Sequence, residues 1–499
     1  MLGFFSGKPD HPLIDSRQAK VIFNEIAVGE PLRAVKEATV WLESLMALDG
    51  VKLEQRLNLV MQLDETAISQ ARRLGREYLA VGRNQRQQEA KLWEACASYW
   101  GHLAMAYSSC LERYHAQEKD ADAVRRQLPM LYARLIGVLA AQLKWEQFRY
   151  GPISGEIWMA LGRIYLAAVA AQCERKPRAV YPNASPTSIE SEYLKALVFH
   201  ASSMGNLTPM EIEIAERFIA HFLPFFSLLS ESRPESVYWV DAAKSFPPTR
   251  LIKAPEASST LRFFNGASGS EAVIRMMEQI RAEKHVPAEI NLGAQYAVGI
   301  VLPVLNHLEK NWAPTPPVRS NVRHRVSSRL TVVHGLDAVQ MRLAGDFDYF
   351  GQTDQAETWL VEDASLGGMG AQAPISHNDW IRIGALVAMQ PEGGDNWLIG
   401  IVRRYARSGA HQGAVGIQTM SKSPQAIVAD ANGFKTEVIL LDAPGVGGYV
   451  RIALSPAVLE ERAELHFLLD GKTVELSPRN CLEKGDDYAI AHFFVQRFG

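Results

Sequence analysis

Four arginines stand close together in the second half of the chain. Arg319, Arg323, Arg325 and Arg329 fall within eleven residues, and no acidic residue occurs in the stretch 310–336 to neutralise them. A guanidinium group presents five donors in a planar fork, which matches a phosphate group or the O6/N7 edge of guanine. This arginine arm is therefore a candidate site for an anion.

A second group of polar residues follows the alternating run Glu357–Asp363. Asp363 and Ser365 stand just before two consecutive glycines, Gly367 and Gly368, where a strand is expected to end in a tight turn. Glycine lets a ligand come close to the backbone. A carboxylate can accept hydrogen bonds from the N–H groups on the edge of guanine opposite the arginine-binding edge. A ligand that carries both phosphate and guanine would use the arm and the loop together.

The order of these motifs, RxxxR in the arm and then DxSxxG in the loop, resembles the PilZ domain family, whose members bind the bacterial second messenger cyclic di-GMP. The resemblance runs from Val318 to about Ser423 and includes strand-like segments at 396–403 and 415–417. It implies an antiparallel β-barrel, and a cyclic di-GMP effector in the control of motility, biofilm or secretion. Its ligand would be held by residues drawn from Arg319, Arg323, Arg325, Arg329, Asp363, Ser365, Gly367 and Gly368.

The register of the arm stays open, because Arg325 and Arg329 also have the RxxxR spacing. We favour Arg319 and Arg323, since family members usually have a valine three residues after the second arginine, and Val326 stands there. Two structural alternatives remain. The arginines could form a solvated basic linker, and the loop could be an ordinary Asx or Ser turn closed by glycine.

Length and composition predict a multidomain protein with ordinary packed cores. The chain has 499 residues, 47% of them hydrophobic and 21% charged, and a net charge of -3. Such a length favours two to four domains. The small net charge argues against a general nucleic-acid binder, which needs a broad basic face. We find no secretory leader and no long apolar stretch without a charge, which predicts a soluble cytoplasmic protein.

Helical periodicity dominates the part of the chain before the arm, and strand-like alternation dominates the part after it. The fold class predicted is multidomain α+β, with a large helical region followed by β-barrels. The expected domains are a helical bundle (1–175), a second helical subdomain with a short strand element (186–312), the PilZ-like β-barrel with its arm (318–425), and a β-rich extension or second small barrel (430–499).

Neither catalysis nor metal binding is predicted. The sequence has no GxSxG, Walker A, HExxH or Rossmann glycine motif, and its four cysteines show no CxxC pair. We therefore expect no cofactor and no enzyme, with cyclic di-GMP as a ligand and a protein partner on the helical region. The alternative is a PilZ-like interaction scaffold that does not bind the nucleotide.

Overall fold

The computed structural model describes residues 11–82, 85–315, 321–345, 356–375, 380–409 and 411–498. Their contacts group the chain into two compact units. The first unit consists of Met1–Arg149, Ile153–Met204 and Pro209–Pro317, and the second of Tyr150–Pro152, Gly205–Thr208 and Val318–Gly499. The finer division into four domains stays a prediction.

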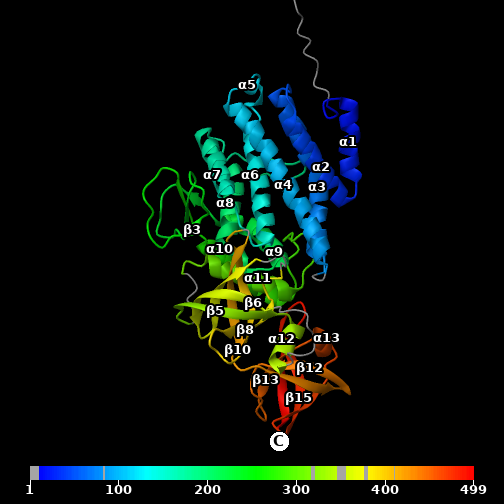
Figure 1. The fold of residues 1–499 in the computed structure, drawn as a ribbon. Coiled ribbons are helices and arrows are strands. Elements are labelled where there is room, and N and C mark those ends of the chain that lie inside the picture. Colours follow the sequence, from blue (N-terminus) through cyan, green and yellow to red (C-terminus); the bar gives the residue numbers. More distant parts are fainter. Residues whose placement is uncertain are drawn as a thin grey trace, which may run out of the picture. The chain divides into compact units, whose positions relative to one another are not determined.

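The first unit is built mainly from helices, drawn in blue to green in Figure 1. Its α-helices are α1 (Ser16–Val28), α2 (Pro31–Ala47), α3 (Leu53–Ala80), α4 (Arg86–His115), α5 (Ala121–Val124), α6 (Leu128–Phe148), α7 (Gly155–Ala170), α8 (Ile189–Ala201), α9 (Pro209–Phe222), α10 (Ala267–Glu283) and α11 (Val298–Trp312). Short 3-10 turns occupy Met204–Asn206 and Leu223–Phe225. No helix in the described part of the chain is long and apolar enough to cross a membrane.

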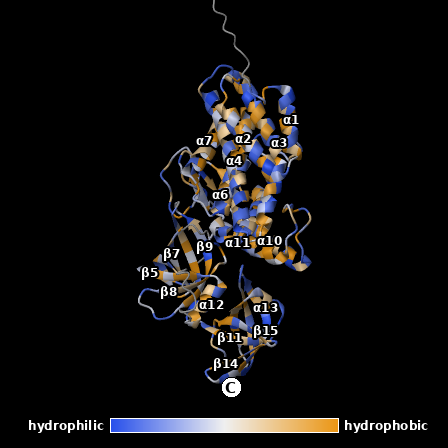
Figure 2. Cartoon of the chain, turned by 45° about the vertical axis from the view of Figure 1, so that its right-hand side comes forward, coloured by the Kyte–Doolittle hydropathy of each residue, from blue (hydrophilic) through white to orange (hydrophobic). Residues whose placement is uncertain are grey.

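Local chemistry explains where several helices begin. The Asp15 carboxylate accepts from the first N–H groups of α1, and the Ser154 hydroxyl accepts from Glu156 N in α7. Each helix buries an apolar face, and hydrophobic and hydrophilic residues alternate around the helices in Figure 2. Apolar residues recur at helical spacing throughout 121–150, yet this stretch forms two helices, α5 and α6. Pro129, which suits a first turn and not a helix interior, stands at the start of α6.

The first unit also contains a four-stranded sheet in the order β1-β4-β2-β3. The strands are β1 (Leu228–Leu229), β2 (Tyr238–Asp241), β3 (Thr249–Arg250) and β4 (Leu261–Phe264). Only the segment around β2 was expected to be extended. The other strands are too short to show an alternating pattern in the sequence, so tertiary pairing defines them.

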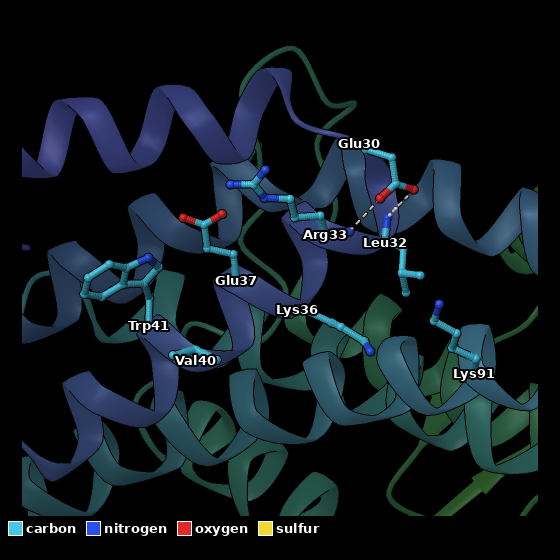
Figure 3. A pocket seen from close by; sticks show the side chains of 8 residues that line it. All are labelled: Glu30, Leu32, Arg33, Lys36, Glu37, Val40, Trp41 and Lys91. Carbon is cyan, nitrogen blue, oxygen red and sulfur yellow. Dashed lines mark hydrogen bonds between the residues drawn. The ribbon is translucent and has the colours of Figure 1, made fainter.

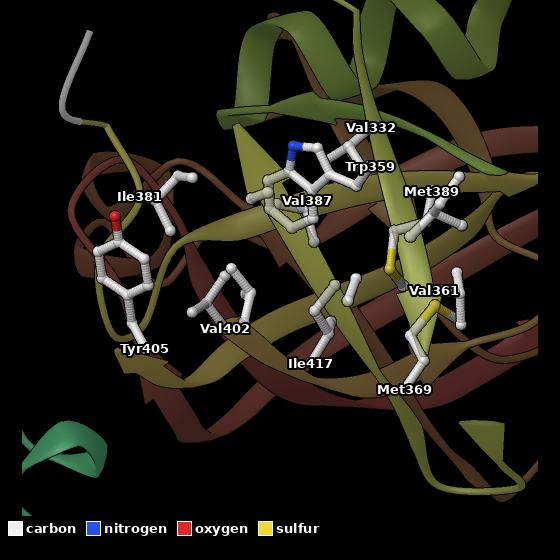
Figure 4. Packing of buried hydrophobic residues seen from close by; sticks show 14 of the residues in the cluster. Val332, Trp359, Val361, Met369, Ile381, Val387, Met389, Val402, Tyr405 and Ile417 are labelled. Atoms are coloured by element: carbon white, nitrogen blue, oxygen red, sulfur yellow. The ribbon is translucent and has the colours of Figure 1, made fainter. Parts of the chain in front are cut away.

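The second unit begins with a closed barrel in the order β10-β7-β6-β5-β8-β9, which the pairing of β9 with β10 completes. Its strands are β5 (His324–His334), β6 (Glu357–Ser365), β7 (Gly368–Pro374), β8 (Leu386–Pro391), β9 (Leu398–Arg407) and β10 (Gln412–Ser421). Inward-facing side chains such as Trp359, Val361, Met389 and Ile417 fill it, as Figure 4 shows. The barrel interior is therefore a packed core.

A second closed barrel follows, in the order β11-β12-β13-β16-β15-β14. Its strands are β11 (Gln425–Ala431), β12 (Phe434–Leu440), β13 (Tyr449–Leu454), β14 (Leu465–Leu469), β15 (Lys472–Lys484) and β16 (Ala489–Phe498), with α13 (Pro456–Glu460) between β13 and β14. Asp470-Gly471, a dipeptide typical of hairpin turns, joins β14 to β15, and both residues have positive φ (51° and 76°). The multidomain α+β fold class is thus confirmed, with the extension forming a second barrel.

The two barrels share a third apolar cluster. It joins α12 (Leu336–Ala344) with outward-facing residues of both barrels, among them Leu386, Ile401, Ile439 and Tyr488. A barrel that stood alone would expose these side chains. The second unit is therefore held together by a core between its barrels as well as by the core inside each one.

Candidate ligand-binding site

The antiparallel pairing of β5 with β6 brings the end of the arginine arm to the DxSxxG loop. His324 is paired with Ala364, and Arg325 with Asp363. Next to this pairing, Arg323 Nη1 donates a hydrogen bond to Asp363 Oδ1, which joins two residues that are 40 positions apart in the sequence. The side chains of Arg323 and Asp363 are 31% and 33% exposed, so a ligand in solvent can reach both of them.

A β-bulge turns Asp363 to the outside of the barrel. Trp359 and Val361 point into the core, so simple alternation would point Asp363 inward as well. The pairing of β6 with β7 shifts between Val361 and Asp363, which places Asp363 opposite Gly370. The neighbours of Gly370 on β7, Met369 and Ala371, lie in the core, so Gly370 and Asp363 face outward. Bulges often re-aim side chains in this way at binding sites.

The turn between β6 and β7 leaves little room for side chains at its two glycines. A Cβ on Gly368 would lie 2.1 Å from the carbonyl oxygen of Ile417, and a Cβ on Gly367 would lie 2.9 Å from Asn321 Nδ2. Thr419 N donates to the Gly367 carbonyl at 3.1 Å, and Ser365 Oγ donates to the Gly368 carbonyl at 3.1 Å. Ser365 thus helps to close the turn, as the Ser-turn alternative expects.

The structure separates the other arginines of the arm. Arg325 is exposed and opposite Asp363, at the same end of β6 as the loop. Arg329 is exposed too, but it is paired with Leu360 and its backbone N–H donates to Glu392 Oε2 at 3.1 Å. Arg329 therefore lies farther along the barrel wall from the loop. Arg319 lies outside the described residues.

Gly370 belongs to this site and was not predicted. A Cβ there would lie 2.9 Å from Asp363 Oδ1 and 3.3 Å from Arg323 Nη1, so the absence of a side chain leaves room for the ion pair. The residue follows the DxSxxG motif by two positions, and its sequence context gives no reason to select it. Only the pairing of β6 with β7 places it beside Asp363.

A second concave surface lies on the helical unit and is shown in Figure 3. It has a volume of about 530 Å³ and is lined by Glu30, Leu32, Arg33, Lys36, Glu37, Val40, Trp41 and Lys91. Three cations and two carboxylates share the lining, and Glu30 is already used to cap α2 through the N–H groups of Leu32 and Arg33. This mixture of charges makes it a weaker anion site than the arginine arm.

The described residues contain no group of three or more His, Cys, Asp or Glu side chains arranged to hold a metal ion. Cys96, Cys110 and Cys173 are buried free thiols, and Cys481 is exposed. Burial raises the pKa of Cys110 to about 12, so this thiol stays protonated and unreactive at neutral pH. The site at the end of β6 contains guanidinium, carboxylate, hydroxyl and backbone groups.

Comparison with known proteins adds information on the helical part of the chain. No curated protein matches the sequence. One family model does match, over less than half of the chain, and the matching stretch takes in the helices from α1 to α9. Residues 17–234 match the model described as the N-terminal domain of the cyclic-di-GMP receptor FimW.

Proposed function

We propose that this protein is a cyclic di-GMP receptor and that the nucleotide binds to a PilZ-like first barrel, at the end of β6. Arg319 and Arg323 would bind phosphate and the O6/N7 edge of guanine, and Asp363 would accept from guanine N–H groups. Ser365, Gly367 and Gly368 would let the ligand approach the turn. The helical unit would carry the signal to a protein partner.

The observation that carries this proposal is the direct pairing of Arg323 with Asp363. Two motifs that are far apart in the sequence meet at one exposed place on the barrel. The bond to Asp363 uses one of the five N–H donors of Arg323, so donors remain for a ligand. The family match of residues 17–234 supports the same ligand independently, because it covers a different part of the chain.

The positions of the arginines support the register of Arg319 and Arg323. Arg323 contacts the loop directly, whereas Arg329 lies beside Leu360 and Glu392 on the barrel wall. Arg325, opposite Asp363, is close enough to the loop to assist. A ligand bound at the turn would therefore contact Arg323 before it could reach Arg329.

Isothermal titration calorimetry of the full chain with cyclic di-GMP tests the proposal. We expect saturable binding of one ligand per chain, because Val318 stands where family members that bind two ligands tend to have a further arginine. Cyclic di-AMP is the control ligand. Adenine lacks the O6 acceptor and the N1–H donor of guanine, so it should bind much more weakly. Absence of heat with cyclic di-GMP would favour the scaffold that does not bind nucleotide.

A further inference from the structure

Four residues form a row across the outside of the first barrel. Asp363 on β6 is paired with Gly370 on β7, Gly370 with Gly416 on β10, and Gly416 with Arg404 on β9. Met369 and Ala371 flank Gly370, Val415 and Ile417 flank Gly416, and Tyr405 follows Arg404; all five are buried in the barrel core. Because side chains alternate along a strand, the row itself faces outward.

The two glycines have no side chains of their own, and charged side chains of the neighbouring strands lie over them. A Cβ on Gly370 would lie 2.9 Å from Asp363 Oδ1 and 3.3 Å from Arg323 Nη1. Asp363 and Arg323 lie at the Gly370 end of the row. Arg404 lies at the Gly416 end, where a Cβ on Gly416 would lie 3.2 Å from the Cβ of Arg404. Neighbouring strands are about 4.8 Å apart, so the backbones of Asp363 and Arg404 are roughly 14 Å apart across three spacings. A flat ligand that displaces these side chains from above the two glycines would have a charged group at each end of the row.

Arg404 has no other role in the described structure. It is exposed, and no carboxylate among the described residues lies within ion-pair distance of it. Its Cδ lies 4.0 Å from the position of a Cβ on Gly416, so the side chain of Arg404 lies against this glycine. The adjacent Arg403 differs, because it donates to Gln418 Oε1 at 2.8 Å and to Glu483 Oε2 at 2.6 Å.

We propose that Arg404 is a further ligand-binding residue, which contacts a phosphate of a cyclic di-GMP molecule that lies across Gly370 and Gly416. This inference rests on the proposed function, since Arg323 and Asp363 hold the other end of the ligand. The ligand carries two negative phosphate charges, and Arg404 is an exposed guanidinium with all its donors available. The glycines put no side chain of their own between a planar base and the strands.

The first test is the affinity of Arg404→Ala for cyclic di-GMP by calorimetry. Loss of one charge-assisted hydrogen bond predicts about 10–100-fold weaker binding. Arg404→Lys should stay within several-fold of the unmodified protein, because an ammonium group also binds phosphate. The matched control is Lys435→Ala, which removes an exposed positive charge from the second barrel and should leave the affinity unchanged.

A second variant tests whether the ligand lies over Gly416. Gly416→Val places a side chain against the Cβ of Arg404, over the middle of the row, and should weaken binding strongly. Unchanged affinity in this variant would show that the ligand does not lie over Gly416. If Arg404→Ala binds like the unmodified protein while Arg323→Ala does not, the role of Arg404 is wrong and the proposed function stands. If Arg404→Lys is as weak as Arg404→Ala, the phosphate contact is wrong. If the unmodified protein does not bind, both proposals are wrong.

Discussion

Arg323 is the residue on which the proposed site depends most, because its guanidinium group is hydrogen-bonded to the Asp363 carboxylate. Arg323→Ala should weaken cyclic di-GMP binding by on the order of 2–4 kcal/mol, since it removes charge-assisted hydrogen bonds and leaves a ligand group unpaired. Arg329→Ala is the matched control, because Arg329 lies away from Asp363 on the same strand. Calorimetry of both variants decides the register. A larger loss in Arg329→Ala would assign the ligand to Arg325 and Arg329.

Asp363 has two roles that a single substitution can separate. It accepts a hydrogen bond from Arg323, and we propose that it also accepts hydrogen bonds from the N–H groups of guanine. Asp363→Asn should lose most of the preference for cyclic di-GMP over cyclic di-AMP. The ligand-free stability should fall by no more than about 1 kcal/mol, because exposed ion pairs contribute little. Melting temperature and affinity are measured on the same sample. A large loss of stability with unchanged selectivity would make Asp363 a structural residue.

At the scale of elements, the sequence is a good guide to helices and strands and a poor guide to bulges. Helical periodicity predicts α2, α3 and α4 within a few residues of their observed ends. The direction of Asp363 could not be predicted, because a bulge depends on the partner strand and alternation alone points this side chain inward. The row from Asp363 to Arg404 could not be predicted for the same reason, because it depends on how four strands pair.

The helical unit contains a buried polar cluster that helical periodicity does not predict either. Asp64 on α3 is fully buried and accepts from Tyr107 at 2.7 Å and from Tyr181 at 3.1 Å, with Arg134 Nη1 3.5 Å away. Tyr181 belongs to the proline-rich loop between α7 and α8. The cluster therefore fixes this loop to the α3, α4 and α6 helices. Burial raises the pKa of Asp64 to about 6, although Arg134 and the two hydroxyls favour the charged form.

This raised pKa predicts a stability change between pH 4 and pH 7. Between pH 4 and about 6 the folded protein keeps a proton on Asp64 that the unfolded chain releases, so the stability present at low pH is lost as the pH rises through about 6. Relative to Asp64→Asn, which does not titrate, the unfolding free energy should fall by on the order of 2–3 kcal/mol. Denaturant unfolding of both proteins at several pH values measures it. If the unfolding free energy of the unmodified protein, relative to that of Asp64→Asn, stays constant or rises with pH, Asp64 is charged over the whole range.

At the scale of the whole second unit, the hairpin that joins β15 to β16 ties the second barrel to the first. Tyr488 is fully buried, and its hydroxyl donates to the Gly384 carbonyl at 2.9 Å. Leu336 N donates to Asp487 Oδ2 at 2.6 Å, and Arg403 is paired with Glu483. Arg403 also donates to Gln418, which is paired with Gly368 of the candidate site. The second barrel thus supports the wall of the first barrel next to the proposed ligand.

Tyr488→Ala should therefore lower the stability of both barrels to a similar extent. Truncation of a fully buried aromatic side chain costs about 3–5 kcal/mol, and this one lies in the cluster formed by α12 and the two barrels. Hydrogen exchange should become faster in β8 and β9 of the first barrel to the same extent as in β13 and β16 of the second. Leu468→Ala, at a side chain of the second barrel that is 72% exposed, is the control and should change neither barrel. If only the second-barrel strands exchange faster in Tyr488→Ala, the barrels are independent folding units, and the second one does not stabilise the ligand site.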